Sequence, residues 1–234
     1  MKKNAYNFQE GELLLIDKPL EWTSFDVVKK IRNLTKAKKV GHAGTLDPLA
    51  TGLLIICTGK LTKQIDNYQA QQKEYTGTML LGRTTPSFDL ETDYNSQQPT
   101  EHITPEQIHQ ATAQFTGVIM QQPPQYSAIK VGGERVYKKA RQGKTVKIEP
   151  RQVEVPTFEI TGIKMPDVNF RVVCSKGTYI RSLAHDFGQA IGCGACLTQL
   201  TRTKIGDFSL QNAMLLSDFG QHIKTLTHGD TPRH

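Results

Sequence analysis

Short runs of apolar and β-branched residues follow one another along this chain, and turn residues close each run. Most neighbouring runs are close in sequence. Antiparallel strands can be joined by short connections, whereas parallel strands need a crossover of a dozen or more residues. The spacing therefore predicts an α+β fold, with a mixed, largely antiparallel central sheet and helices packed on it. The predicted strands cover residues 11–17, 52–57, 73–81, 152–161, 168–174, 195–202 and 204–208.

Three stretches place apolar residues at helical spacing next to capping signals. Ser24 is the expected N-cap of the first helix. Thr104 and Gln107 form a capping box for the second, which should continue to Gly117. Gly192 should end the third, which begins near residue 180. Shorter helices are expected at 61–68 and 136–141.

The length of 234 residues suits a single domain, taken here as 1–234. Residues 121–151 read as a basic insertion, because they contain few apolar residues, paired prolines and paired glycines. Residues 209–234 read as a tail. No run approaches the roughly 20 apolar residues of a membrane span, and the polar start lacks a signal-peptide core. A cytoplasmic location without membrane contact is the resulting expectation.

The four cysteines are expected to be free thiols rather than two disulfides, because a chain of this size can bury a sufficient core. Cys193 and Cys196 form a lone CxxC pair. A tetrahedral zinc site needs four ligands, and no second pair of suitable residues is present. We therefore expect no metal.

The net charge of +7 is concentrated in two segments. Residues 29–39 contain six basic residues and no acidic one, and residues 130–151 contain eight basic residues against two acidic ones. Such patches on a more acidic body are typical of proteins that bind a polyanion locally. Two solvated lysine-rich faces would explain the composition as well.

The segment 41–52 combines three glycines with His42, Asp47 and Pro48, between a basic run and a buried strand. Glycine lets a backbone approach a ligand closely, and Asp-Pro places a carboxylate at a rigid corner. Catalytic residues concentrate in loops anchored by strands. A catalytic Asp47 and a structural Asx turn both fit this pattern.

Five distinctive blocks follow one another along the chain, namely DKP at 17–19, GHAGTLDPLATGLL at 41–54, PQYSAIK at 124–130, YKKARQG at 137–143 and CSKGTYIR at 174–181. In this order they resemble the TruB family of tRNA pseudouridine-55 synthases. The resemblance runs from about Glu12 to Phe208 and implies the pseudouridine synthase fold.

The resemblance implies a cofactor-free isomerase with three catalytic residues, Asp47, Arg181 and Tyr75. Asp47 is the essential carboxylate for breaking the N1–C1′ bond of a uridine and rejoining the uracil through C5. It could add to the base, bond to C1′ or remove the C2′ proton, and each role needs an ionised carboxylate. Arg181 is expected to keep Asp47 ionised by pairing with it.

The resemblance also implies how the base is bound. Tyr75 should stack on the target uracil and assist proton transfer from C5, while Tyr179 and Leu200 line the pocket. His42 should fill the space that the flipped nucleotide leaves in the RNA. Flipping costs a few kcal/mol, because a stacked base hides the atoms that react. Stacking and pocket hydrogen bonds offset that cost.

The basic insertion resembles the segment with which this family grips RNA. It should contact phosphates of the T-arm of tRNA through Lys130, Lys138, Lys139 and Arg141. The resemblance implies no protein partner. Many family members continue into a small C-terminal RNA-binding domain, and we expect no separate domain of this kind here.

Two other functions fit parts of the sequence. An RNA-binding or tRNA-folding chaperone would need the basic patches and a pocket, but not the chemistry of Asp47. A synthase for another RNA would keep the catalytic residues and differ in the residues that bind the RNA. The presence of Asp47, Tyr75 and Arg181 together favours the tRNA enzyme.

Overall fold

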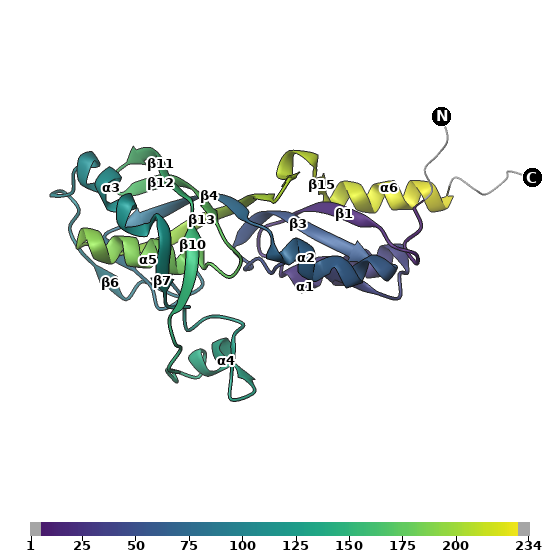
Figure 1. Ribbon diagram of the computed structural model, residues 1–234, viewed down its shortest axis with the longest axis horizontal. Helices are drawn as coiled ribbons and strands as arrows, with labels where there is room; N and C mark the ends of the chain where they lie inside the picture. Colours follow the sequence, from purple (N-terminus) through teal and green to yellow (C-terminus); the bar gives the residue numbers. More distant parts are fainter. Residues whose placement is uncertain (1–5, 229–234) are drawn as a thin grey trace, which may run out of the picture. The chain divides into compact units, whose positions relative to one another are not determined.

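The computed structural model describes residues 6–228, which form two compact units (Figure 1). One unit combines the chain up to Lys73 with the chain from Thr201 onward, and the other comprises Glu74–Leu200. Strand pairs in both units are mostly antiparallel, and helices pack on the sheets. This arrangement confirms the predicted α+β class. Within residues 6–228, no helix is long and apolar enough to cross a membrane.

The first unit is organised around β3, whose residues Leu53–Cys57 are completely buried. β3 pairs antiparallel with β1 and with β2, and β1 pairs parallel with β15. Helices α1 and α6 cover one face, while η1 and α2 contribute apolar residues to the other. The elements are β1 (Leu13–Lys18), α1 (Ser24–Thr35), β2 (Val40–His42), β3 (Ala50–Thr58), η1 (Gly59–Gln64), α2 (Ile65–Ala70), β14 (Phe208–Ser209), η3 (Leu210–Asn212), β15 (Met214–Leu215) and α6 (Leu216–His228).

The predicted N-cap of α1 is wrong by one residue. Thr23 caps the helix: its hydroxyl accepts from Asp26 N at 3.0 Å, and its own N–H donates to Asp26 Oδ2 at 3.0 Å. This is a reciprocal capping box. Ser24 is buried instead, and its hydroxyl forms hydrogen bonds with the backbone N–H and carbonyl of Leu46.

The second unit packs α3 and α5 against a sheet in which β12 lies between β11 and β4. Phe158 of β11 packs edge-on against Phe170 of β12 and also contacts Phe187 of α5. The elements are β4 (Lys73–Leu81), β5 (Arg83–Thr84), β6 (Ser96–Gln97), α3 (Pro105–Ala111), η2 (Thr112–Phe115), β7 (Gly117–Gln121), β8 (Lys130–Val131), β9 (Glu134–Arg135), α4 (Val136–Ala140), β10 (Arg151–Val155), β11 (Thr157–Lys164), β12 (Asp167–Cys174), α5 (Ile180–Ile191) and β13 (Ala195–Ile205), the last of which ends in the first unit.

Three predicted strand and helix boundaries differ from those in the structure. The expected strand 152–161 is two strands, because Pro156 cannot donate to a ladder: β10 pairs with β7, and β11 with β12. The expected strands 195–202 and 204–208 are instead the single strand β13, followed by a short hairpin to β14. The helix after Thr104 ends at Ala111 and continues only as a 3₁₀ turn.

The antiparallel ribbon of β7 and β10 leads into the basic insertion. Figure 1 shows the insertion, labelled by α4, beyond the ends of these two strands. It contains the small hairpin of β8 and β9 and the predicted short helix, observed as Val136–Ala140. The insertion therefore has its own local structure on a two-stranded stalk.

Candidate active site

Asp47 lies in the connection between β2 and β3 of the first unit. Its side chain is half-buried, and its carbonyl accepts from Ala50 N at 3.1 Å. The preceding Leu46 is buried, and Ser24 binds its backbone on both sides, accepting from Leu46 N at 2.9 Å and donating to Leu46 O at 3.3 Å. The segment before the carboxylate is thereby fixed to the start of α1.

Lys18, at the end of β1, is fully buried and supports the other side of this loop. Its ammonium donates to the carbonyls of Pro19 at 2.9 Å, Trp22 at 2.5 Å and Pro48 at 3.3 Å. Burial lowers the pKa of Lys18 to about 8, while the negative charge of Asp47 opposes this shift. At neutral pH the loop therefore rests on a buried cation.

Arg202 of β13 is a second buried cation in this unit. It donates from Nε to Leu53 O at 2.8 Å and from one terminal nitrogen to Gly44 O at 3.1 Å. Gly52 has a φ of +102°, and a Cβ there would lie 2.4 Å from the Arg202 carbonyl oxygen. Only glycine fits this position without displacing backbone. Lys18 and Arg202 thus hold the backbone on opposite sides of Asp47.

His42, at the end of β2, is half-buried. Burial, followed by the positive charge of Arg202, lowers the pKa of His42. Its Nδ1 atom is buried and has no hydrogen-bond partner within residues 6–228. His42 is therefore a neutral imidazole at physiological pH.

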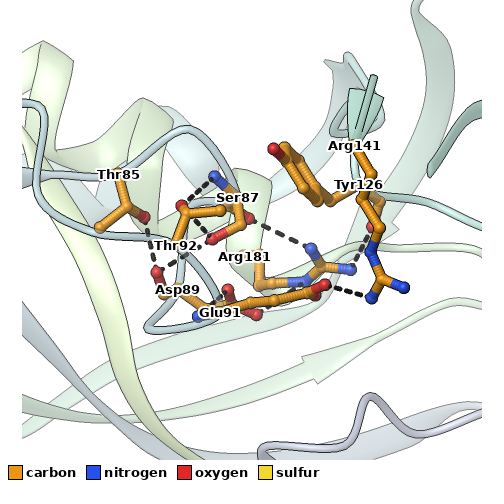
Figure 2. A network of polar contacts seen from close by, with 8 residues as sticks. All are labelled: Thr85, Ser87, Asp89, Glu91, Thr92, Tyr126, Arg141 and Arg181. Carbon is orange, nitrogen blue, oxygen red and sulfur yellow. Dashed lines mark hydrogen bonds and ion pairs between the residues drawn. The ribbon is translucent and has the colours of Figure 1, made fainter. Parts of the chain in front are cut away.

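Arg181, in the first turn of α5, is the centre of a polar network in the second unit (Figure 2). The side chain is only 3% exposed. One terminal nitrogen donates to Ser87 O at 3.1 Å and the other to Tyr126 O at 3.0 Å. Nε lies 3.5 Å from Asp89 Oδ2 in a buried ion pair. Each of the three guanidinium nitrogens thus has a partner within the protein.

Asp89 is itself held by the turn that contains it (Figure 2). Its Oδ1 accepts from Glu91 N at 3.0 Å. Its carbonyl accepts from Thr85 Oγ1 at 2.6 Å and from Ser87 Oγ at 3.0 Å. Ser87 N donates to Thr92 Oγ1 at 3.1 Å. The carboxylate that faces Arg181 is therefore built into a rigid turn.

The residues expected to bind the uracil lie on β4, on β13 and directly before α5, all in the second unit. Tyr75 on β4 is 8% exposed, and Leu200 on β13 is 9% exposed. Tyr179 precedes α5, and the amide of Gln121 both donates to Tyr179 O at 3.0 Å and accepts from Tyr179 N at 2.8 Å. The Arg151 guanidinium lies over the Tyr179 ring, 4.9 Å from its centroid. Backbone and ring of Tyr179 are both constrained.

The four basic residues expected to bind phosphates differ in their surroundings. Arg141 donates to Glu91 Oε1 at 2.6 Å, and this carboxylate raises the pKa of Arg141. Lys139 lies 3.5 Å from a carboxylate of β9. Lys130 and Lys138 are exposed, and neither forms an ion pair with any residue that the structure describes. Arg141 also connects the insertion to the turn that holds Arg181 (Figure 2).

The structure groups the expected residues by unit. Asp47 and His42 belong to the first unit, and the remaining expected residues belong to the second. The ion pair expected between Asp47 and Arg181 stays a prediction. Sequence reasoning missed four supporting residues, although Lys18 lies in one of the matching blocks. These are Lys18, Ser24, Asp89 and Arg202.

All four cysteines are buried and none forms a disulfide, as predicted. Burial raises the pKa of Cys57 and of Cys196 to about 11, so both are protonated and unreactive at neutral pH. Among the side chains of the described residues, no group of three or more His, Cys, Asp or Glu could hold a metal ion.

Comparison with known proteins gives a consistent result. The family profile described as TruB family pseudouridylate synthase (N terminal domain) matches residues 32–180. The profile of the tRNA pseudouridylate synthase B C-terminal domain matches residues 181–231. A protein of Flavobacterium johnsoniae named tRNA pseudouridine synthase B is 54% identical over 224 residues, which are 93% of this chain and 98% of that protein. Its namesake in Phocaeicola vulgatus is 51% identical over 223 residues, covering 93% of this chain and 95% of that protein.

The structural comparison agrees. The crystal structure of a Cbf5-Nop10-Gar1 complex contains a chain that is 30% identical, with a TM-score of 0.75. The match covers 96% of this chain and 58% of that one. A chain from an H/ACA RNP bound to a substrate RNA containing 2′-deoxyuridine is 27% identical, with a TM-score of 0.73, over 97% of this chain and 57% of that one. With both profiles and close relatives covering almost its whole length, the chain belongs to the TruB family of pseudouridylate synthases.

Proposed function

We propose that this protein converts uridine 55 in the T-loop of tRNA to pseudouridine, with Asp47 as the essential carboxylate. Family membership supports an isomerase, and the names of the relatives support tRNA as the substrate. The enzyme would act in the cytoplasm, where tRNA is modified and used.

The reaction needs no cofactor, because its atoms and electrons balance within the nucleoside. The N1–C1′ bond breaks, the uracil turns, and a C5–C1′ bond forms. The proton on C5 leaves to solvent, and N1 gains one. What the protein must supply is a positioned carboxylate, a pocket for the base and a route for the C5 proton.

The observation that carries the proposal is the way the Asp47 loop is held. Buried side chains bind its backbone before and after the carboxylate: Ser24 and Arg202 on one side and Lys18 on the other. A catalytic group must be kept within about 0.5 Å of its productive position by such supporting contacts. A structural Asx turn at the surface would not need two buried cations beneath it, since burying a charge is costly.

The other expected residues take roles that fit their surroundings. Arg181, with its guanidinium fixed in three directions, is the proposed partner of the Asp47 carboxylate. Tyr75 stacks on the uracil and assists departure of the C5 proton, while Tyr179 and Leu200 line the pocket. His42, a neutral ring, fills the space in the RNA stack without adding charge.

The T-arm is gripped by the insertion. Lys130 and Lys138 are the main phosphate contacts in this proposal, because Lys139 and Arg141 are engaged by carboxylates of the protein. Phosphate contacts position an RNA without reading its sequence, so selection of the uridine falls to the pocket and the T-loop shape.

The proposed position can be tested by incubating the protein with a tRNA transcript and mapping pseudouridine through carbodiimide adducts that stop primer extension. The expected result is one new stop, at position 55, that is absent when this uridine is replaced by cytidine. A stop elsewhere, persisting in the replaced transcript, would assign the enzyme to another uridine.

A further inference from the structure

Next to the Arg181 network lies an aromatic stack that the proposed chemistry does not use. The rings of Phe88 and His185 are 3.8 Å apart between centroids and only 13° from parallel. Phe88 stands between Ser87 and Asp89, the two residues of its turn that contact Arg181. His185 is on α5, the helix that carries Arg181.

The spacing on α5 places these contacts side by side. Residues four apart on a helix are neighbours on its surface, so Arg181 and His185 share one face. Ser87 and Asp89 bind Arg181, and Phe88 stacks on the next turn through His185. Ser87, Phe88 and Asp89 thereby contact two successive helical turns of α5.

The backbone of Phe88 is unusual and is fixed from both ends. Its φ is +66°, in the left-handed region that bulky residues rarely adopt. Phe88 N donates to Thr85 O at 3.2 Å, and Phe88 O accepts from Leu197 N at 2.9 Å. A side chain persists in such a conformation only when its surroundings determine it, and functional sites are where this occurs most often. The reversed backbone lets the ring reach His185 while both neighbours face Arg181.

His185 contributes a ring rather than a hydrogen bond in this stack. Its Nδ1 atom is buried and has no hydrogen-bond partner in the described part of the chain. Burial lowers the pKa of His185, so the ring is neutral at physiological pH. A neutral ring one helical turn from Arg181 stacks without placing a second positive charge beside the guanidinium.

We propose that Phe88 and His185 are positioning residues, whose stack fixes the turn so that Ser87 and Asp89 hold the Arg181 guanidinium at its working angle. Neither residue is assigned contact with the RNA. The inference rests on the proposed function, in which Arg181 serves the catalytic carboxylate.

The test compares single-turnover and steady-state tritium release from tRNA labelled at C5 of uridine. Phe88→Ala should lower kcat about tenfold, equivalent to about 1.4 kcal/mol, and leave KM within about twofold. His185→Ala should behave in the same way. The double variant should lose no more than either single variant, because both remove one interaction. His185→Phe, which keeps a stacking ring, should retain kcat within about twofold.

A purely structural role would couple activity to stability, and two further variants separate them. Phe88→Gly allows the left-handed backbone without steric cost, so its Tm should be no lower than that of Phe88→Ala, while kcat stays equally low. Phe8→Ala removes a different stack, Tyr6 with Phe8 at 5.0 Å and 15°, far in sequence from the turn. It should leave kcat within about twofold.

Several outcomes overturn the inference. It fails if Phe88→Ala keeps full kcat, if the losses of the two alanine variants multiply in the double variant, or if kcat follows Tm across the series. If Phe88→Ala does not fold, the contrast of His185→Ala with His185→Phe decides the question. If the wild type releases tritium in an Asp47-dependent manner and the variants of the stack release it equally fast, only this inference is refuted. If the wild type releases no tritium, this inference and the proposed function are both refuted.

Discussion

Replacing the buried Lys18 by methionine should change how the stability of the first unit depends on pH. The ammonium is fully buried and donates to three carbonyls, yet its pKa is about 8 against an ordinary value of 10.5. Burial therefore penalises the charged form by more than the nearby carboxylate of Asp47 compensates.

The sign and size follow from proton linkage. Below pH 8 the folded and unfolded states both hold the proton, and the folded state bears the full penalty. Between pH 8 and 10.5 the unfolded state holds more protons, so the free energy of unfolding rises with pH. A shift from 10.5 to about 8 corresponds to about 3 kcal/mol in total, of which about 2–3 kcal/mol develops between pH 7 and pH 10.

The assay is urea unfolding followed by the fluorescence of Trp22, the only tryptophan, which lies in the same unit as Lys18. The difference in unfolding free energy between wild type and Lys18→Met should grow by about 2–3 kcal/mol from pH 7 to pH 10 in favour of the wild type. Lys29→Met, at an exposed lysine of α1, is the matched control and should show no such growth.

Parallel pH profiles for wild type and Lys18→Met would refute this reasoning. They would mean that Lys18 has an ordinary pKa in the folded protein and is hydrated, and the loop of Asp47 would then not rest on a desolvated cation.

Three further outcomes are expected. Asp89→Asn should reduce kcat at least tenfold in tritium release, because the buried guanidinium of Arg181 loses its ion pair with Asp89 and is held less firmly in place; breaking such a buried pair also destabilises a protein by about 3–5 kcal/mol. An unchanged kcat would contradict the assigned support. The double variant Lys130→Ala/Lys138→Ala should weaken tRNA binding and lower the slope of log affinity against log salt by about 1–2, whereas an unchanged slope would remove the insertion from the RNA interface. Gly52→Ala should lower the Tm by more than 10 °C or prevent folding, because the added Cβ meets β13 backbone at 2.4 Å; a wild-type Tm would contradict the packing at this corner.

Elements with strong local signals were predictable from sequence. The helix opened by Thr104 begins with the expected capping box, and α5 ends at Gly192 in the left-handed conformation. β4 covers Lys73–Leu81 as predicted, and Tyr75, Met79 and Leu81 at alternate positions are buried. In each case the signal lies within a few residues of the element that it determines.

The predictions were wrong where tertiary contacts decided between two structures that the local sequence allows equally well. Thr23 and Ser24 are both good N-caps, and Ser24 is excluded because its hydroxyl binds Leu46, 22 residues away. β13 runs through Thr203 without a break, and its last residues, Lys204 and Ile205, pair with β14. Local patterns do not contain these long-range partners.

The candidate site shows the same division. Asp47 stood out through its unusual loop, but its support by Arg202 joins residues more than 150 positions apart. Asp89 lies in a polar, turn-rich stretch, and no local pattern in the sequence distinguishes it from the other acidic residues there. Only the fold brings it to Arg181 and so distinguishes it from its neighbours.

The most direct test of the account is tritium release from tRNA carrying [5-³H]uridine, measured for wild type and Asp47→Asn, with RNA binding followed in parallel. C5 loses its hydrogen when it becomes the glycosidic carbon, so release reports the isomerisation itself. The account predicts release by the wild type and none by Asp47→Asn, with RNA binding retained within a few-fold. Release by Asp47→Asn at the wild-type rate, or tight binding by a wild type that releases nothing, would contradict it.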